Sequence, residues 1–159
     1  MKNVFLSFAV SISLLLSSLA SAETQEVYWE DLVPEGYVAT PQEQVSHQGS
    51  TLAQAEPNAP VVDAYDGKDV KIPGFVVPLE GDDKNLTEFL LVPYFGACIH
   101  VPPPPSNQIV HVKFEKGVPV DDLYDAVWIS GKLSTKGWSG DIATVGYSMT
   151  GITVEPYDG

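Results

Sequence analysis

Short β-branched segments separated by turn residues recur along the chain, and this spacing constrains the fold more than any other feature. The segments repeat about every ten residues, which is typical of small all-β barrels and sandwiches. No stretch has the 3.6-residue periodicity of an amphipathic helix, apart from one short turn at 120–124. The pattern predicts strands at Asp69–Glu80, Phe89–Val92, Asn107–Phe114, Ala126–Leu133, Ile142–Met149 and Gly151–Glu155.

The predicted strands favour a closed or partly closed barrel over other all-β arrangements. In the segment Asn107–Phe114, alternation puts Val110 and Val112 on one face and His111 on the other. Pro73–Gly74 predicts a bulge or bend, and Pro78 predicts an interruption of strand pairing. Five or six short, glycine-bent strands in this order predict an OB-like barrel, with a β-sandwich as the alternative.

The chain has room for one domain. We expect the barrel to occupy residues 61–159. Residues 23–60 are predicted to form an extended N-terminal arm and linker, because the stretch 40–59 is polar and nearly lacks large apolar residues. Within the arm, the segment Val27–Pro34 is expected to dock one aromatic side chain onto the core.

Residues 1–22 have the pattern of a secretory signal peptide. Lys2 provides the positive start, Val4–Leu19 the apolar core, and Ala20-Ser21-Ala22 the small-residue cleavage site. The alternative, a membrane anchor, is disfavoured because the apolar run is shorter than the ~20 residues that span a bilayer. The sequence therefore predicts cleavage before Glu23, export to the periplasm and no membrane insertion afterwards.

The charge of the chain limits its partners. The formal net charge is -13 and arginine is absent. A strongly acidic chain repels the phosphates of nucleic acids and of anionic lipid surfaces. We therefore predict no nucleic-acid partner.

The single cysteine, Cys98, cannot form an intramolecular disulfide. In an oxidising compartment, a free thiol is vulnerable unless it is buried, bound to a metal or intended to react. Cys98 is therefore the first candidate for a functional residue.

The segment around Cys98 has the chemistry of a metal site. Residues two apart on an extended chain point to the same side, so Cys98 and His100 could converge on one ion. A thiolate with an imidazole suits Zn²⁺, Cu or Ni, and Zn²⁺ is the leading prediction. The prolines at 102–105 form a stiff rod that would restrict the loop, with Pro103 and Pro104 at its centre. We expect this rod to be exposed.

Further ligands are predicted at Glu80, which closes a strand, and at His111. Asn107 and Gln108 are expected to brace the loop through hydrogen bonds. The structural alternatives are a buried thiol for Cys98, a loop-carbonyl partner for His100, a charged strand end for Glu80 and a solvent-facing position for His111.

Other chemistries fit less well. Blue-copper sites use a longer spacing between cysteine and histidine, and thioredoxin-like chemistry needs a second cysteine. A cysteine-dependent enzyme using Cys98 with His111 stays open as an alternative, although it has no identifiable third member. A second alternative is a metal-free interaction module whose proline-braced loop docks on a membrane transporter.

Several motifs resemble a proteobacterial secreted family known as domain of unknown function 3299. They are Gly74–Glu80, Phe89–Pro105 with Asn107–Gln108, Trp29–Pro34 and Val127–Gly131. Genes of this family often lie beside an ABC transporter of the lipoprotein- or macrolide-export type and beside zinc-responsive genes. The resemblance therefore implies a periplasmic accessory protein for metal handling, serving an ABC-type transport system.

Overall fold

The structure is a computed structural model that describes residues 24–39, 54, 56–98, 102–123 and 125–159. The predicted signal peptide and His100 lie outside the described residues. The described chain forms eight strands and four short 3-10 helices. The strands are β1 (Gln25–Glu26), β2 (Asp69–Gly81), β3 (Asn85–Val92), β4 (Val110–Pro119), β5 (Val127–Ser134), β6 (Trp138–Ser139), β7 (Thr144–Val145) and β8 (Tyr147–Pro156). The helices are η1 (Trp29–Leu32), η2 (Asp63–Tyr65), η3 (Ser106–Gln108) and η4 (Val120–Leu123).

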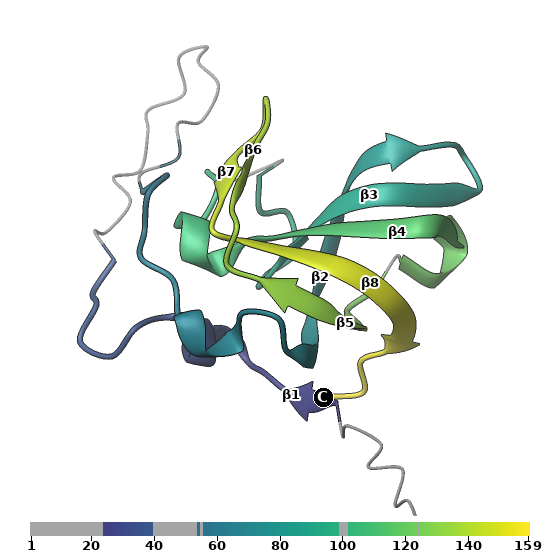
Figure 1. The fold of residues 1–159 in the computed structure, drawn as a ribbon. Coiled ribbons are helices and arrows are strands. Elements are labelled where there is room, and N and C mark those ends of the chain that lie inside the picture. Colours follow the sequence, from purple (N-terminus) through teal and green to yellow (C-terminus); the bar gives the residue numbers. More distant parts are fainter. Residues whose placement is uncertain (1–23, 40–53, 55, 99–101, 124) are drawn as a thin grey trace, which may run out of the picture.

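Five of the strands close into a barrel (Figure 1). Their order is β2-β3-β4-β8-β5, and β5 returns to pair with β2. All neighbours in the barrel are antiparallel except β4 and β8, which are parallel. Numbered along the barrel, this is the order 1-2-3-5-4-1. The predicted OB-like barrel is therefore confirmed, and β1 adds a short parallel strand beside β2.

Strand β2 pairs with two different strands, and its partner changes at Gly74. Its first half, Asp69–Gly74, pairs with β5, and the half that begins at Phe75 pairs with β3. A Cβ at Gly74 would lie 2.7 Å from the carbonyl oxygen of Val92, so no side chain fits there. The bend predicted at Pro73–Gly74 is confirmed, and a register shift follows Pro78.

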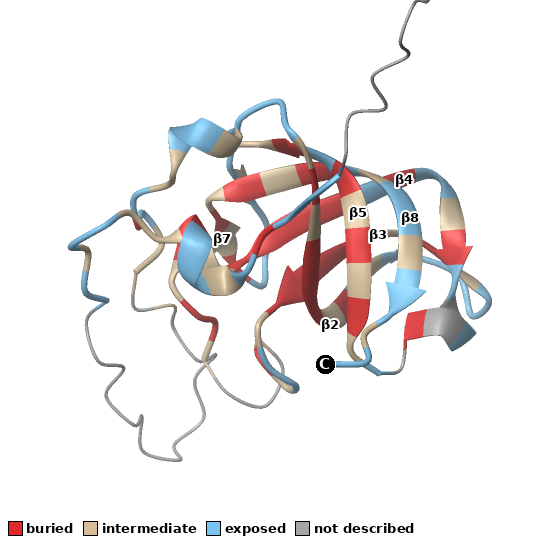
Figure 2. Cartoon of the chain, turned by 90° about the horizontal axis from the view of Figure 1, so that it is seen from below, coloured by how far each residue is buried: buried red, intermediate tan, exposed pale blue. Residues whose placement is uncertain are grey.

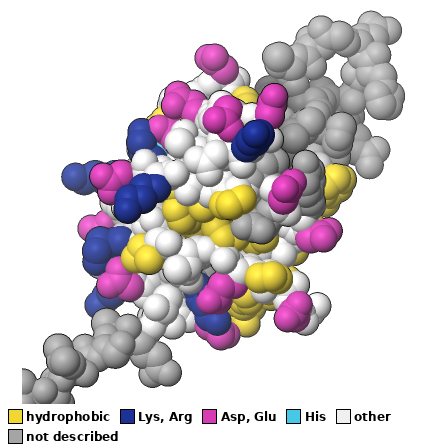
Figure 3. Space-filling model, turned by 90° about the vertical axis from the view of Figure 1, so that its right-hand side faces the viewer, with side chains coloured by type: hydrophobic (Ala, Val, Ile, Leu, Met, Phe, Trp, Pro, Cys, Tyr) yellow, Lys and Arg dark blue, Asp and Glu magenta, His cyan; other side chains and the backbone are white. Residues whose placement is uncertain are grey.

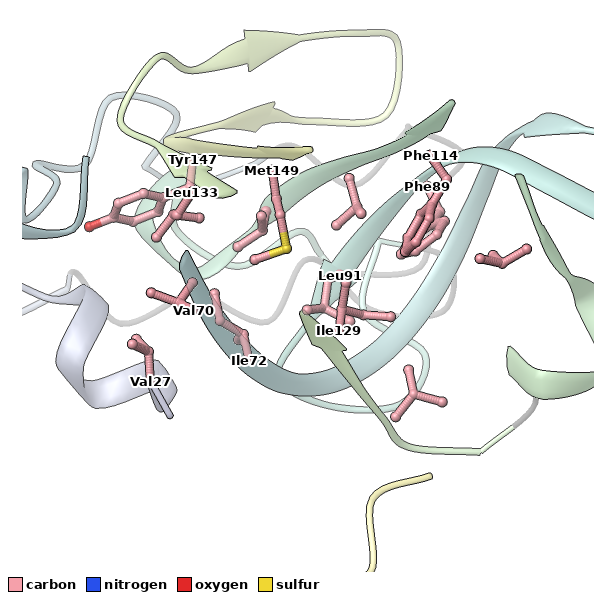
Figure 4. Packing of buried hydrophobic residues seen from close by; sticks show 14 of the residues in the cluster. Val27, Val70, Ile72, Phe89, Leu91, Phe114, Ile129, Leu133, Tyr147 and Met149 are labelled. Atoms are coloured by element: carbon pink, nitrogen blue, oxygen red, sulfur yellow. The ribbon is translucent and has the colours of Figure 1, made fainter. Parts of the chain in front are cut away.

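The core fills the barrel with the inward-facing residues of all five strands (Figure 4). Phe89 of β3 stacks on Phe114 of β4, with 5.9 Å between ring centroids. Val110 and Val112 face this core, as the alternation predicts. Figure 2 shows buried residues of β5 alternating with mostly half-buried ones. Among the described residues, no helix is long and apolar enough to cross a membrane.

The N-terminal segment packs on the barrel. Trp29 donates a hydrogen bond from Nε1 to the carbonyl oxygen of Pro73 at 2.7 Å and packs against the core. Leu32 is fully buried. The Tyr147 hydroxyl donates to the carbonyl oxygen of Leu32 at 2.8 Å and accepts from the backbone N–H of Val62 at 2.6 Å. The prediction that this segment docks an aromatic side chain is confirmed.

The predicted pair of final strands is wrong. β8 runs without a break from Tyr147 to Pro156. Gly151 lies inside β8, at a position where a Cβ would come within 2.3 Å of the Phe114 ring. Upstream, Thr144–Val145 pairs with Trp138–Ser139 to form the separate hairpin β6–β7. This hairpin projects from one end of the barrel (Figure 1).

Two other boundaries also differ. The start of the predicted strand Asn107–Phe114 forms helix η3, so β4 begins at Val110. The strand then continues through Gly117, whose φ of 69° fits glycine, although Glu115–Gly117 has the composition of a turn. The helical turn predicted at 120–124 is confirmed as η4.

Candidate functional site

A second apolar cluster, separate from the barrel core, is formed by residues of β2, β3 and β7 and of the loops beside them. Its buried members are Val77, Leu90, Val92, Ala97, Ile109, Ala143 and Val145, and we call this group the outer cluster. Cys98 and Trp138 pack against it, partly buried. β3 and β4 are the second and third barrel strands, and OB barrels use the outer face of these strands for ligands. The outer cluster thus marks this face as the candidate site.

Beside the outer cluster, an imidazole, a carboxylate and an ammonium group interact. His111 of β4 is 8% exposed, and its Nε2 lies 3.1 Å from Oε2 of Glu88 on β3. The Lys113 ammonium contacts the other oxygen of Glu88. This lysine and His111 hold the pKa of Glu88 below its ordinary value, and Glu88 in turn raises the pKa of Lys113. Glu88 is therefore a carboxylate at neutral pH.

His111 also anchors the β6–β7 hairpin. The Trp138 indole of β6 stacks on the His111 ring with 4.5 Å between centroids and 9° between planes. A ring held between Glu88 and Trp138 has little freedom to turn. The alternative of a solvent-facing His111 is wrong, because the hairpin covers this part of β4.

Glu80 lies near the end of β2 and is exposed. It stands opposite Glu88 in the pairing of β2 with β3. Its charge contributes to the raised pKa of Lys113. Glu80, Glu88 and Lys113 therefore form a charged group at the edge of the outer face.

Cys98 has an unusual backbone conformation. Its φ is 66°, and it is the one described non-glycine residue with a positive φ. A residue with a Cβ pays a free-energy cost in this region, and such positions cluster at functional sites. The thiol is partly buried, and burial raises its pKa to about 11.

The protonated state of Cys98 bears on the cysteine-enzyme alternative. With a pKa of about 11, only about one thiol in ten thousand is ionised at pH 7. The thiolate is the reactive form of cysteine, so this environment disfavours a nucleophile. The predicted convergence of Cys98 with His100 lies outside the described residues.

The proline rod is buried where the sequence predicts exposure. Pro103 and Pro104 are both buried. The Gln54 side-chain amide donates to the carbonyl oxygens of Pro104 and Thr144, each at 2.8 Å. The expectation of an exposed rod is therefore wrong, and Gln54 links Pro104 to Thr144 of β7.

The residues after the prolines hold the N-terminal segment. Asn107 donates from Nδ2 to the carbonyl oxygen of Pro60 at 2.9 Å, and Gln108 donates from Nε2 to that of Trp29 at 2.8 Å. The Ser106 hydroxyl accepts from the backbone N–H of Ala59 at 2.8 Å. Helix η3 therefore ties the end of the proline loop to two points of the preceding chain.

The described residues alone do not complete a metal site. No three His, Cys, Asp or Glu side chains among them form a group that could hold an ion. The donor types near the outer face still suit Zn²⁺, because a thiol and carboxylates are zinc ligands. A site would need His100, beyond the described part of the loop.

Sequence reasoning missed Glu88, Trp138 and Gln54. Glu88 had a recognisable signal, because it shares the outer face of its strand with Leu90, directly before a run of apolar residues. Trp138 lies among glycines and serines that resemble an ordinary loop. Gln54 lies in a polar stretch without any pattern.

One protein family and one solved structure are similar to this chain. Residues 29–156 match the family described as "Protein of unknown function (DUF3299)". A crystal structure of a DUF3299 family protein from Pseudomonas aeruginosa PAO1 is similar, with 46% sequence identity and a TM-score of 0.76. The similarity covers 86% of this chain and 97% of that one. No curated protein matches the chain. The chain therefore belongs to the DUF3299 family.

Proposed function

We propose that the chain is a periplasmic binding protein for a transition-metal ion, Zn²⁺ above all, and that it serves an ABC-type transport system. The observation that carries the proposal is the position of Cys98. The backbone of Cys98 is in the left-handed region, and its thiol is free and partly buried. The side chain packs against the outer cluster, on the barrel face that binds ligands in other OB folds. Cys98 is the only thiol of the chain. A strained backbone at this residue is consistent with a side chain that is held in position to bind a metal ion.

Cys98 and His100 would supply the first two ligands. Glu80 suits the third position better than His111. Its carboxylate is exposed at a strand end, whereas the His111 ring is held by Glu88 and Trp138. Leu79, the residue before Glu80, packs against the same outer cluster as Cys98.

Substitution of the ligands tests this proposal. We expect Cys98→Ser and His100→Ala each to weaken Zn²⁺ binding at least about a hundredfold, because each removes a bond to the metal. Glu80→Gln should weaken it less. Zn²⁺ titration against a chelating dye, with protein purified without a histidine tag, measures these changes. His47→Ala and Glu115→Gln are matched controls, because each removes a group of the same type that is not among the proposed ligands; Glu115 is exposed.

Affinity for the metal should also fall with pH. Because burial raises the pKa of the Cys98 thiol to about 11, a metal must displace a proton from it throughout the neutral range. Affinity should therefore drop about tenfold for each pH unit between 8 and 6, with a further loss as imidazole protonates. Zn²⁺ affinity that is equal at both ends of this range would rule out a thiolate ligand.

A second function is favoured by one observation. Phe95 is 74% exposed, and its neighbour Tyr94 is also exposed, on the same loop as Cys98. Exposed adjacent aromatic side chains are typical of protein-interaction anchors. If Cys98→Ser and wild type bind Zn²⁺ equally, Cys98 is not a ligand, the metal proposal for this loop fails, and docking of the loop on a partner becomes the leading alternative.

A further inference from the structure

A pocket of about 380 Å³ lies between the β6–β7 hairpin and the segment 57–61. The pocket is open to solvent over much of its extent, so it would contact one side of a ligand and would not enclose it. The described residues that line it are Pro57, Asn58, Ala59, Val61, Ser106, Thr135, Gly137, Trp138, Ser139, Thr144, Val145 and Gly146. None of the proposed metal ligands is among them.

The lining is neutral and polar around one aromatic residue. Although the chain has a net charge of -13, none of the described lining residues carries a charge. Hydroxyl groups come from Thr135, Ser139 and Thr144, and an amide comes from Asn58. Hydroxyls and amides both donate and accept hydrogen bonds, which is what the hydroxyls of a sugar require. Trp138 adds an apolar surface for the C–H groups of a sugar ring.

The walls of the pocket are fixed in place. Gln54 accepts from the backbone N–H of Thr144 at 2.9 Å and donates to its carbonyl oxygen at 2.8 Å. The Gly146 N–H donates to the carbonyl oxygen of Ser106 at 2.6 Å. Trp138 is held by its stacking on His111. A preformed pocket binds its ligand with a smaller entropic cost.

The place of the pocket in the fold narrows the ligand class. The β6–β7 hairpin connects β5 and β8, the fourth and fifth barrel strands. The connection between these strands is one that OB folds use to bind oligonucleotides or oligosaccharides. An acidic chain with no charged group in the pocket lining gives no support to phosphate binding. Figure 3 shows acidic and basic side chains mixed around hydrophobic ones on one face of the molecule.

We propose that this pocket binds a neutral sugar unit of an oligosaccharide. The ring lies against Trp138, and its hydroxyls bond to the hydroxyl and amide side chains of the lining. The site is separate from the proposed metal ligands, so either function can hold without the other.

Nuclear magnetic resonance of the full chain tests the proposal with N,N′-diacetylchitobiose and maltotriose as neutral probes. We expect one or both to shift the amide signals of Gly137 and Gly146 and the Trp138 indole signal. Ser139 is an exposed lining residue, so Ser139→Tyr fills the pocket without entering the core. It should weaken binding at least about tenfold. Thr150→Tyr, an exposed position on β8, is the matched control and should bind normally.

The outcomes are distinct. Shifts at these signals that Ser139→Tyr abolishes and Thr150→Tyr preserves support the proposal. No shift with either neutral probe up to roughly 20 mM, far above a weak dissociation constant, overturns it. Equal binding by Ser139→Tyr also overturns it, because the ligand then lies elsewhere. Stronger binding of trigalacturonate or of a thymidine hexanucleotide contradicts the neutral class of ligand.

Discussion

Replacing Tyr147 with Phe removes only one hydroxyl group, but we expect it to lower the free energy of unfolding by about 2–4 kcal/mol. That hydroxyl donates to the carbonyl oxygen of Leu32 and accepts from the N–H of Val62, and Tyr147 itself is fully buried. Burial also raises the pKa of its phenol, so the hydroxyl stays neutral. Without it, a buried carbonyl and a backbone N–H lose their partner, and each costs about 1–3 kcal/mol.

Urea unfolding followed by circular dichroism measures this loss. Tyr157→Phe is the matched control, because the Tyr157 ring packs against Trp128 near the surface. Its stability should stay within about 0.5 kcal/mol of wild type. Equal stability of Tyr147→Phe and wild type would mean that the barrel does not depend on its contacts with the N-terminal segment.

Substituting Gly131 with Val is expected to separate β5 from β8. A Cβ at Gly131 would lie 2.3 Å from the carbonyl oxygen of Thr150 and 2.8 Å from Cγ of Met149. The first clash is with backbone, so a side-chain rotation cannot relieve it. We expect a loss of about 3 kcal/mol or more, at the upper end of overpacking effects.

Thermal unfolding is the measurement for this prediction. Lys132→Val changes the next residue of β5, which is exposed and pairs with Asp69 at 3.2 Å. It introduces the same β-branched side chain and should cost less than about 1 kcal/mol. Equal midpoints of thermal unfolding for the Gly131→Val and Lys132→Val proteins would contradict the close β5–β8 contact.

The barrel could be predicted because its signals are local. Alternating residues such as Val110 and Val112 define the inner face of a strand, and Gly74 stands where the chain must bend. The role of Gly151 could not be predicted, because only the ring of Phe114 on another strand explains its glycine. The predicted break before Gly151 does not occur, and β8 continues from Tyr147 to Pro156.

Less of the candidate site could be predicted from the sequence. His111 and Cys98 stand out by residue type. The stacking of Trp138 on His111 depends on a hairpin whose pairing joins residues that have no strong alternation. Pro104 likewise accepts a hydrogen bond from Gln54, a distant residue in a polar stretch. Long-range contacts of this kind leave no local pattern in the chain.

The most direct measurement of the metal proposal is the zinc K-edge X-ray absorption spectrum of the chain from Glu23 onward, loaded with one equivalent of Zn²⁺. The account predicts one sulfur neighbour at about 2.3 Å, from Cys98, together with nitrogen or oxygen neighbours at about 2.0–2.2 Å. The sulfur shell should disappear in Cys98→Ser. A spectrum of the wild-type protein with nitrogen and oxygen neighbours alone would contradict the account, because Cys98 would then not be a ligand.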